Sequence, residues 1–227
     1  AILDATDKYC YAQGAFNVNA VAQAKAVIEV HEMFRSAAIL QGADLANGFM
    51  GGRTDFQNAT LEDKKVGARN IAEAVKKYAV SSPIPVALHL DHGKNFDSCK
   101  AAIDGGYTSV MIDGSSLPFE ENIELTREVV KYAHERGVVV EAELGKLAGI
   151  EDDVNVSASD AMYTDPAQAE EFVKLTGCDS LAIAIGTSHG AYKFKGEAKL
   201  RFDILEEIGN RLPGFPIVLH GASSVPQ

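Results

Sequence analysis

This chain has no tryptophan, only 7% aromatic residues and three cysteines. The cysteines, Cys10, Cys99 and Cys178, are odd in number and lack a CxxC spacing, so they favour neither a disulfide framework nor a thiolate zinc site and indicate a reducing compartment. No apolar stretch approaches the ~20 residues that span a bilayer, and no signal-peptide pattern opens the chain. We therefore expect a cytoplasmic protein without a membrane partner.

Basic residues are also few, since the chain has 21 Lys and Arg against 32 Asp and Glu, which gives a formal net charge of -11. General nucleic-acid binding is disfavoured, because it needs a basic face that releases counterions. A small anionic substrate stays compatible, because glycine amides and a metal can outweigh the overall charge locally. The apolar content of 46% over 227 residues is typical of an ordinary globular protein with a large core.

A strand-then-helix pattern recurs along the whole chain, with no linker to mark a domain boundary. Short apolar runs bounded by Gly and Pro predict seven strands, at Gly14–Asn19, Ala37–Gln41, Pro85–Asp91, Ser109–Asp113, Val138–Leu144, Ser180–Gly186 and Pro216–His220. Periodic stretches between them predict helices near Val21–Phe34, Leu61–Ala79, Asp97–Asp104, Phe119–Arg136, Pro166–Leu175 and Phe202–Leu212, with residues 1–12 resembling a helix already under way.

Seven βα units in parallel order predict one α/β domain over residues 1–227, a (β/α)8 TIM barrel whose eighth unit and C-terminal helices are missing from this chain. A seven-stranded parallel sheet has open edges and an exposed interior, so we expect the natural protein to continue past Gln227.

Three histidines, His92, His189 and His220, each stand where an apolar run stops and a glycine follows. A lone histidine in such a place is usually an ordinary loop or core residue. Three in the same setting, at the carboxyl ends of parallel strands, predict one metal site. Imidazole suits zinc, and three protein ligands with an open fourth position are the catalytic arrangement.

Carboxylates accompany these histidines. Asp91 precedes His92 and is expected to point into the barrel mouth, either as a general acid or base or as a carboxylate that orients a ligand histidine. Glu141 and Glu143 lie on one face of a buried strand, which is unusual unless a metal or polar site receives them. Glu151 follows on an acidic loop, Gly145–Asn155, which we expect to be mobile and to close over substrate, although a solvated run of charges is the alternative.

Glycines follow two of the histidines, at Gly190 and Gly221, and Ser223 comes shortly after. Exposed backbone amides and a hydroxyl at the mouth of a barrel are typical of phosphate binding, although glycine occurs in any turn.

Six motifs occur in an order that resembles the class II, zinc-dependent ketose-bisphosphate aldolases over nearly the whole chain. They are Ala15-Phe-Asn17-Val-Asn19, His89-Leu-Asp-His-Gly93, Ser109-Val-Met-Ile-Asp113, Glu141-Ala-Glu-Leu-Gly145, Gly186-Thr-Ser-His-Gly-Ala-Tyr192 and Leu219-His-Gly-Ala-Ser223. The resemblance implies reversible cleavage of fructose 1,6-bisphosphate into dihydroxyacetone phosphate and glyceraldehyde 3-phosphate, without a Schiff-base lysine. It also implies small sugar-phosphate ligands and a homodimer or homotetramer.

The resemblance assigns a role to each matching residue. His92, His189 and His220 match the ligands of one catalytic zinc ion per subunit. Asp91 matches the acid/base that handles the C4 hydroxyl, and Glu151 matches the residue that moves the proton at C3. Asp113 and Glu143 match carboxylates near the metal, the first of which sometimes serves a second, monovalent cation. Residues that match substrate or phosphate contacts are Asn17, Gly190, Lys193, Gly221 and Ser223.

Two departures from the family pattern stand out. Ala43 occupies the place where many relatives carry a serine, and the family's later phosphate motif is absent from this chain. The stretch from Gly190 to Gly196 is closer to the fructose-bisphosphate members than to the tagatose-bisphosphate members, which remain the alternative. A zinc-dependent hydrolase on the same fold and a non-catalytic sugar-phosphate-binding protein are the rival classes.

Overall fold

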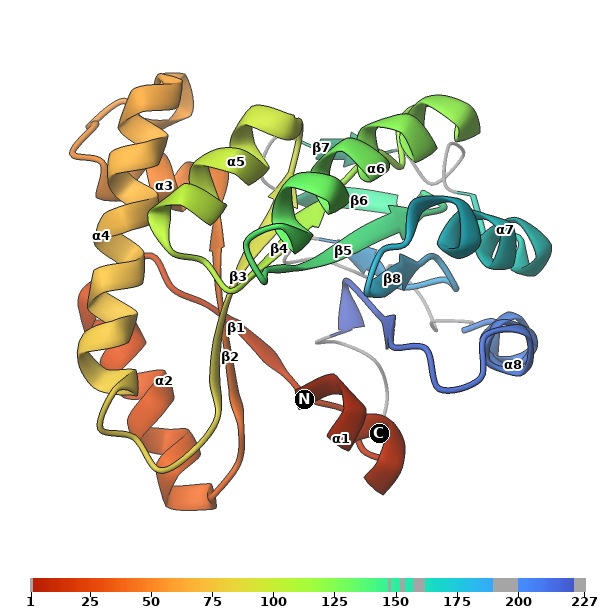
Figure 1. Ribbon diagram of the computed structural model, residues 1–227, viewed down its shortest axis with the longest axis horizontal. Coiled ribbons are helices and arrows are strands. Elements are labelled where there is room, and N and C mark those ends of the chain that lie inside the picture. The colour runs from red at the N-terminus through yellow and green to blue at the C-terminus, as the bar shows by residue number, and fades with distance from the viewer. Residues whose placement is uncertain (1, 147, 152–153, 157–161, 190–199, 223–227) are drawn as a thin grey trace. The chain divides into compact units, whose positions relative to one another are not determined.

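The computed structural model describes residues 2–146, 148–151, 154–156, 162–189 and 200–222 (Figure 1). Its contacts divide the chain into two compact units, the first made of Ala1–Asp113 with Glu128–Val140 and the second of Gly114–Arg127 with Glu141–Gln227. Helix α6 (Phe119–His134) and strand β5 (Val139–Leu144) contribute residues to both units.

Within its described residues, the first unit has four parallel strands in the order β1-β2-β3-β4. The strands are β1 (Ala15–Asn17), β2 (Ala38–Ala43), β3 (Val86–Gly93) and β4 (Ser109–Ile112). The helices are α1 (Ile2–Tyr9), α2 (Val21–Phe34), α3 (Asp44–Met50), α4 (Leu61–Ala79) and α5 (Phe96–Gly105), with a 3-10 turn, η1 (Phe56–Asn58). In Figure 1, α4 runs beside β2 and β3, and α2, α3 and α5 pack against it.

Local sequence explains where these helices begin. Thr60 caps α4 through a reciprocal capping box with Asp63, and the Asn95 side chain accepts a hydrogen bond from the Ser98 amide at the start of α5. Strands β2 and β3 form the core with fully buried Leu40 and Leu90. Strand β2 alternates buried and half-buried residues, whereas β3 is buried from Leu88 to Gly93.

The second unit has three parallel strands in the order β5-β8-β10 among its described residues, with β8 (Ser180–Ile183) between β5 and β10 (Ile217–Val218). Its helices are α7 (Pro166–Thr176) and α8 (Phe202–Arg211). A separate small sheet joins β6 (Ala148–Glu151), β7 (Val154–Val156) and β9 (Ser188–His189) in the order β7-β6-β9. Strand β6 is antiparallel to β7 and parallel to β9.

The alternation of parallel strands and helices confirms the α/β class expected from the sequence. Barrel closure, the missing eighth unit and the single domain stay predictions. The segment Gly145–Asn155 is not the irregular loop that was predicted, because it contains β6 and β7, whose backbones pair with each other. That this segment moves and closes over substrate stays a prediction. Helix α3 was not predicted either. Among the described helices, none combines the length and apolarity needed to cross a membrane.

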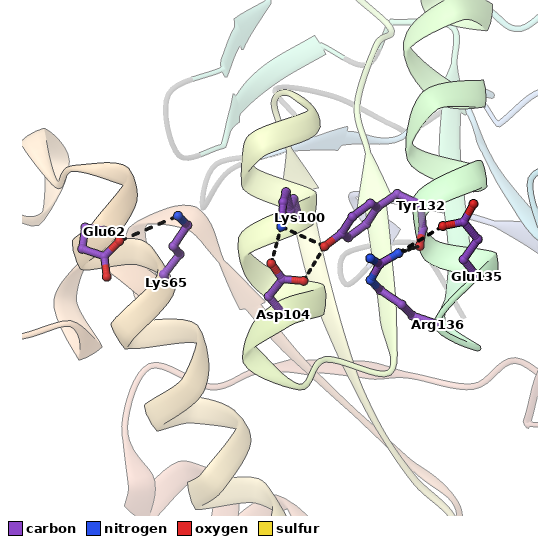
Figure 2. Close-up of polar contacts among 7 residues, drawn as sticks. All are labelled: Glu62, Lys65, Lys100, Asp104, Tyr132, Glu135 and Arg136. Carbon is purple, nitrogen blue, oxygen red and sulfur yellow. Dashed lines mark hydrogen bonds and ion pairs between the residues drawn. The ribbon is translucent and has the colours of Figure 1, made fainter.

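A polar cluster joins α5 to the C-terminal part of α6 on the surface of the first unit (Figure 2). The Tyr132 hydroxyl donates to Asp104 Oδ1 at 2.6 Å and accepts from Lys100 Nζ at 2.8 Å. The guanidinium of Arg136 stacks on the Tyr132 ring, with its Cζ 3.5 Å from the ring centroid. Burial opposes ionisation of Asp104, but hydrogen bonds from Lys100 and Tyr132 outweigh it and lower the pKa of that carboxyl group.

We expect Tyr132→Phe to lower the Tm by about 2 to 4 °C at pH 7, because it removes both hydroxyl bonds and keeps the ring. Since the pKa of folded Asp104 lies below its ordinary value of 3.8, this stabilisation is present above that pH and is lost as the pH falls through the folded value. The Tm difference from wild type should therefore shrink below about pH 3.8. Thermal unfolding followed by circular dichroism tests this, with Tyr78→Phe as the control. Equal Tm values at pH 7 would contradict it.

Candidate functional site

A bulge at the end of β3 positions the central residues of the site. Leu90 pairs with Val110 and Gly93 pairs with Ile112, so β3 holds one more residue than β4 over this interval. The two residues in the bulge are Asp91 and His92, and His92 has a positive φ of 46°. Bulges re-aim side chains, and a left-handed histidine costs roughly 1 to 2 kcal/mol unless its surroundings hold it. Backbone strain of this kind is common at functional sites, where the placement of a side chain such as that of His92 outweighs its cost in stability.

Close packing behind the bulge explains why a glycine follows the histidine. A Cβ atom at Gly93 would lie 2.6 Å from the Met111 carbonyl oxygen and 2.8 Å from Cys99 Sγ. No side chain fits at those distances, so the backbone after His92 can approach β4 only as glycine. The His-Gly pair is therefore a packing requirement at this position.

Asp113 fixes the orientation of the His92 ring. Its Oδ2 lies 3.0 Å from His92 Nδ1, and its amide donates to the Gly93 carbonyl at 2.9 Å. Both side chains are largely buried, and Asp91 Oδ1 lies 3.9 Å from His92 Nε2. A carboxylate on Nδ1 places the proton there and leaves Nε2 as the basic nitrogen that faces Asp91. The structure thus brings together three residues predicted from the sequence: Asp91, His92 and Asp113.

The second unit contains a matching carboxylate–histidine pair. Glu141 aligns with Ser180 on β8, and Ala182 aligns with Val218 on β10, so these residues and His220 share one face of the strands. His220 Nε2 and Glu141 Oε1 are 2.8 Å apart, with β8 between the strands that carry them. The sequence left the partner of Glu141 open, and the structure identifies it as His220.

Glu143, two residues after Glu141, is 2% exposed and lies on the same face of β5. The strand beneath it is held by Asn122, whose side-chain amide donates to the Glu143 carbonyl at 2.9 Å. Asn122 is itself buried and accepts from the Thr126 hydroxyl. The backbone of β5 at Glu143 is therefore held by a buried hydrogen-bond chain from Thr126 through Asn122.

Histidine–carboxylate pairing is also the test of whether these residues suit a metal. A ligating histidine characteristically donates its other ring N–H to a carboxylate, which fixes the tautomer and raises the basicity of the ligand nitrogen. In each pair one ring nitrogen contacts the carboxylate, Nδ1 in His92 and Nε2 in His220, and imidazoles with nearby carboxylates suit zinc. Taken by itself, the histidine–carboxylate pair of each unit is thus of the kind that a zinc ligand has. That His92, His189 and His220 converge on it stays a prediction.

The other predicted residues are placed as follows. Asn17 ends β1 with its side chain exposed, and Gly221 follows His220 with φ 65°. Glu151 ends β6 and His189 ends β9, and their side chains lie outside the described residues, as do Gly190, Lys193 and Ser223. Ala43 ends β2, aligns with Asp91 and provides no side-chain cap to α3.

Asp44 is a buried acid that sequence reasoning missed. Its Oδ2 accepts from Lys64 Nζ at 2.8 Å and from Ser98 Oγ at 2.7 Å, which ties the start of α3 to the first turns of α4 and α5. The nearby Tyr107 hydroxyl is buried and donates to Asn47 Oδ1 at 2.8 Å. The predicted strand ended at Gln41, two residues before the end of β2, so no signal marked Asp44 as the residue that follows the strand.

His89, by contrast, is a satisfied core residue. Its Nδ1 lies 2.7 Å from Ser109 Oγ, on the residue directly across the β3–β4 register. The buried cysteines are also inert, since burial raises the pKa of the Cys178 thiol to about 11. All three cysteines are free thiols.

Comparison with known proteins assigns the family. Residues 1–227 match the family described as "Fructose-bisphosphate aldolase class-II". A fructose-bisphosphate aldolase of Treponema pallidum is 48% identical over 232 residues, covering 95% of this chain and 65% of that protein. One from Helicobacter pylori (strain ATCC 700392 / 26695) is 48% identical over 226 residues, covering 99% of this chain and 68% of its own length. The chain belongs to the class II fructose-bisphosphate aldolase family, and it spans about two thirds of these relatives.

Solved structures agree. A putative fructose-1,6-bisphosphate aldolase from Coccidioides immitis superposes with a TM-score of 0.81 at 31% identity, covering 97% of this chain and 72% of that one. The YdjI aldolase from Escherichia coli K12 gives a TM-score of 0.78 at 33% identity, covering 99% of this chain and 72% of that one.

The His92–Asp113 contact yields a test of metal binding that does not depend on turnover. We expect Asp113→Asn to weaken zinc affinity about 10- to 100-fold, because the neutral amide no longer holds the Nδ1 proton of His92 as a carboxylate does. Competition with a chromogenic chelator measures this. Asp104→Asn is the matched control, since Asp104 contacts Lys100 and Tyr132 and no histidine. Unchanged zinc affinity in Asp113→Asn would show that His92 needs no such support.

Proposed function

We propose that this protein catalyses the reversible aldol cleavage of fructose 1,6-bisphosphate to dihydroxyacetone phosphate and glyceraldehyde 3-phosphate. The observation that carries the proposal is the β3 bulge, which holds Asp91 beside a His92 ring oriented by Asp113. An acid/base group next to a ligand-type imidazole suits a reaction that polarises a carbonyl group and removes a proton from a hydroxyl group of the same substrate. Membership of the class II family supports the same reaction.

In this mechanism the residues share the proton transfers. Zinc, held by His92, His189 and His220, would polarise the C2 carbonyl of the ketose. Asp91 takes the C4 hydroxyl proton, and the electrons of the C3–C4 bond pass to the donor fragment as the aldehyde forms. Glu151 then delivers a proton to C3. Asn17, Gly190, Lys193, Gly221 and Ser223 are assigned to the substrate and its phosphates, and Glu143 to the surroundings of the metal, with Asp113 as a further position for a monovalent cation.

A coupled assay for both triose phosphates tests the proposal. An aldolase releases the two products in equal amounts without consuming water, whereas a hydrolase on this fold would release inorganic phosphate and a binding protein would release neither. Tagatose 1,6-bisphosphate, which differs at C4, is the alternative substrate. The ratio of kcat/KM for the two sugars decides between them. We also propose a cytoplasmic homodimer or homotetramer, which sedimentation of the purified protein would test.

We expect Asp91→Ala to lower kcat about 100- to 10,000-fold, because it removes the group that takes the C4 hydroxyl proton. Zinc content should stay at the wild-type level, since the three imidazoles are untouched. The control is Asp97→Ala, an exposed acid on α5. Cleavage at a near-normal rate would reassign Asp91 to orienting His92.

A separate prediction concerns Glu151. We expect Glu151→Gln to slow exchange of the C3 proton of dihydroxyacetone phosphate by about 100-fold or more, while affinity for that phosphate stays largely intact. Exchange can be followed by proton NMR in deuterium oxide. If exchange survives and the affinity collapses instead, Glu151 is a structural residue and Glu143 becomes the candidate base.

A further inference from the structure

The segment that carries Glu151 begins and ends at one pair of bridged residues, Lys146 and Met162, which we call the neck. The backbones of Lys146 and Met162 exchange two hydrogen bonds of 2.9 Å, which close the segment between them. Just before this bridge, Gly145 has a φ of 100°, and a Cβ atom there would lie 2.6 Å from Thr164 Oγ1. The neck is thus built around a left-handed glycine that packs directly on the Thr164 hydroxyl.

Thr164 joins the ends of two strands at this neck. Its hydroxyl donates to the carbonyl of Leu144, the last residue of β5, and accepts from the Ala184 amide at 2.8 Å, one residue after β8. Its own amide donates to the Ala184 carbonyl at 3.0 Å. Leu144 and Ile183 are the last aligned pair of β5 and β8, so Thr164 extends the contact between those strands beyond their final pair. It is 2% exposed, which keeps water from replacing these bonds.

Beyond the neck, the two strand ends lead to a second pairing. Strand β5 continues through Gly145 to β6, which ends at Glu151, and β8 continues through Ala184 to β9, which ends at His189. Strands β6 and β9 pair in parallel, with Gly149 aligned to His189. Two residues on from that aligned pair stands Glu151. Thr164 therefore fixes, at their roots, the two segments that carry the proposed proton donor and a proposed metal ligand.

From this arrangement we propose that Thr164 is a positioning residue for the proton transfer at C3. Its hydroxyl ties together the ends of β5 and β8, from which β6 and β9 continue, so that any movement of the segment that carries Glu151 starts from a fixed base. The inference rests on the proposed aldolase function and on the assignment of Glu151. Thr164 touches no reacting atom, and it acts only through the neck.

The test compares Thr164→Val with Thr164→Ser. Valine keeps the shape but removes both hydroxyl bonds, so exchange of the C3 proton of dihydroxyacetone phosphate should fall about 10- to 100-fold, the loss that a shift of roughly 1 Å can cause. Affinity for dihydroxyacetone phosphate should stay close to wild type, and serine should restore the exchange rate. Hydrogen exchange of the Lys146 and Met162 amides, followed by mass spectrometry, should speed up in Thr164→Val and not in Thr164→Ser.

Thr176→Val is the matched control. Thr176 is a buried threonine of the same unit whose hydroxyl donates to the Phe172 carbonyl at 2.8 Å and accepts from the Cys178 amide, at the end of α7. It should leave the C3 exchange rate near wild type. Equal losses in the two valine variants would show a general effect on stability and overturn the inference, as would an unchanged C3 exchange rate in Thr164→Val.

Two further outcomes are separable. A wild-type full chain that shows neither cleavage nor C3 exchange would refute the proposed function, and the amide exchange of Lys146 and Met162 would still decide whether Thr164 holds the neck. If Thr164→Val does not fold, Gly145→Ala disturbs the same neck from its other side. It should slow C3 exchange at unchanged phosphate affinity, and a normal rate there would overturn the inference.

Discussion

The extra residue in β3 is the constraint on which the site of the first unit depends. Without it, Asp91 and His92 would follow the strict alternation of a strand, and the two side chains would point to opposite faces. The bulge, with His92 at positive φ, lets the adjacent side chains of Asp91 and His92 lie near each other. The backbone strain at His92 is offset by contacts on both sides of the bulge. Gly93 packs against β4, and Asp113 binds both the ring of His92 and the carbonyl of Gly93.

Each unit repeats the same chemical solution for a buried histidine. A neutral imidazole has one donor and one acceptor nitrogen, and a carboxylate beside one nitrogen decides which is which. Asp113 serves His92 through Nδ1, whereas Glu141 serves His220 through Nε2. Burial would make each carboxylate costly if it stood alone, and the histidine supplies the hydrogen bond that compensates it. The same contacts therefore compensate the buried charge and orient the imidazole, which explains why acids recur on otherwise apolar strands.

Sequence reasoning was strongest where one local pattern determines the structure. The apolar run before His92 predicted a strand at Pro85–Asp91, and β3 occupies Val86–Gly93. The bulge could not be predicted, because it is an offset between two strands and appears only in their register. The Glu141–His220 contact joins residues 79 apart in the chain, beyond any local signal. Helix α3 has seven residues with a glycine and an asparagine inside, so its propensity is weak, and contacts of Asp44 with α4 and α5 hold it in place.

Strand β8 explains how the polar groups of the second unit can meet at all. Its residues on the shared face are small, with Ala182 between the strands that carry Glu141 and His220. Ala184 stands where a Cβ atom at Gly145 would come within 2.8 Å of its own Cβ. A larger side chain at 182 would separate the carboxylate from the imidazole, and one at 184 would press on the neck beside Thr164. Small residues at 182 and 184 therefore leave room for the Glu141–His220 contact and for the packing of Gly145 at the neck.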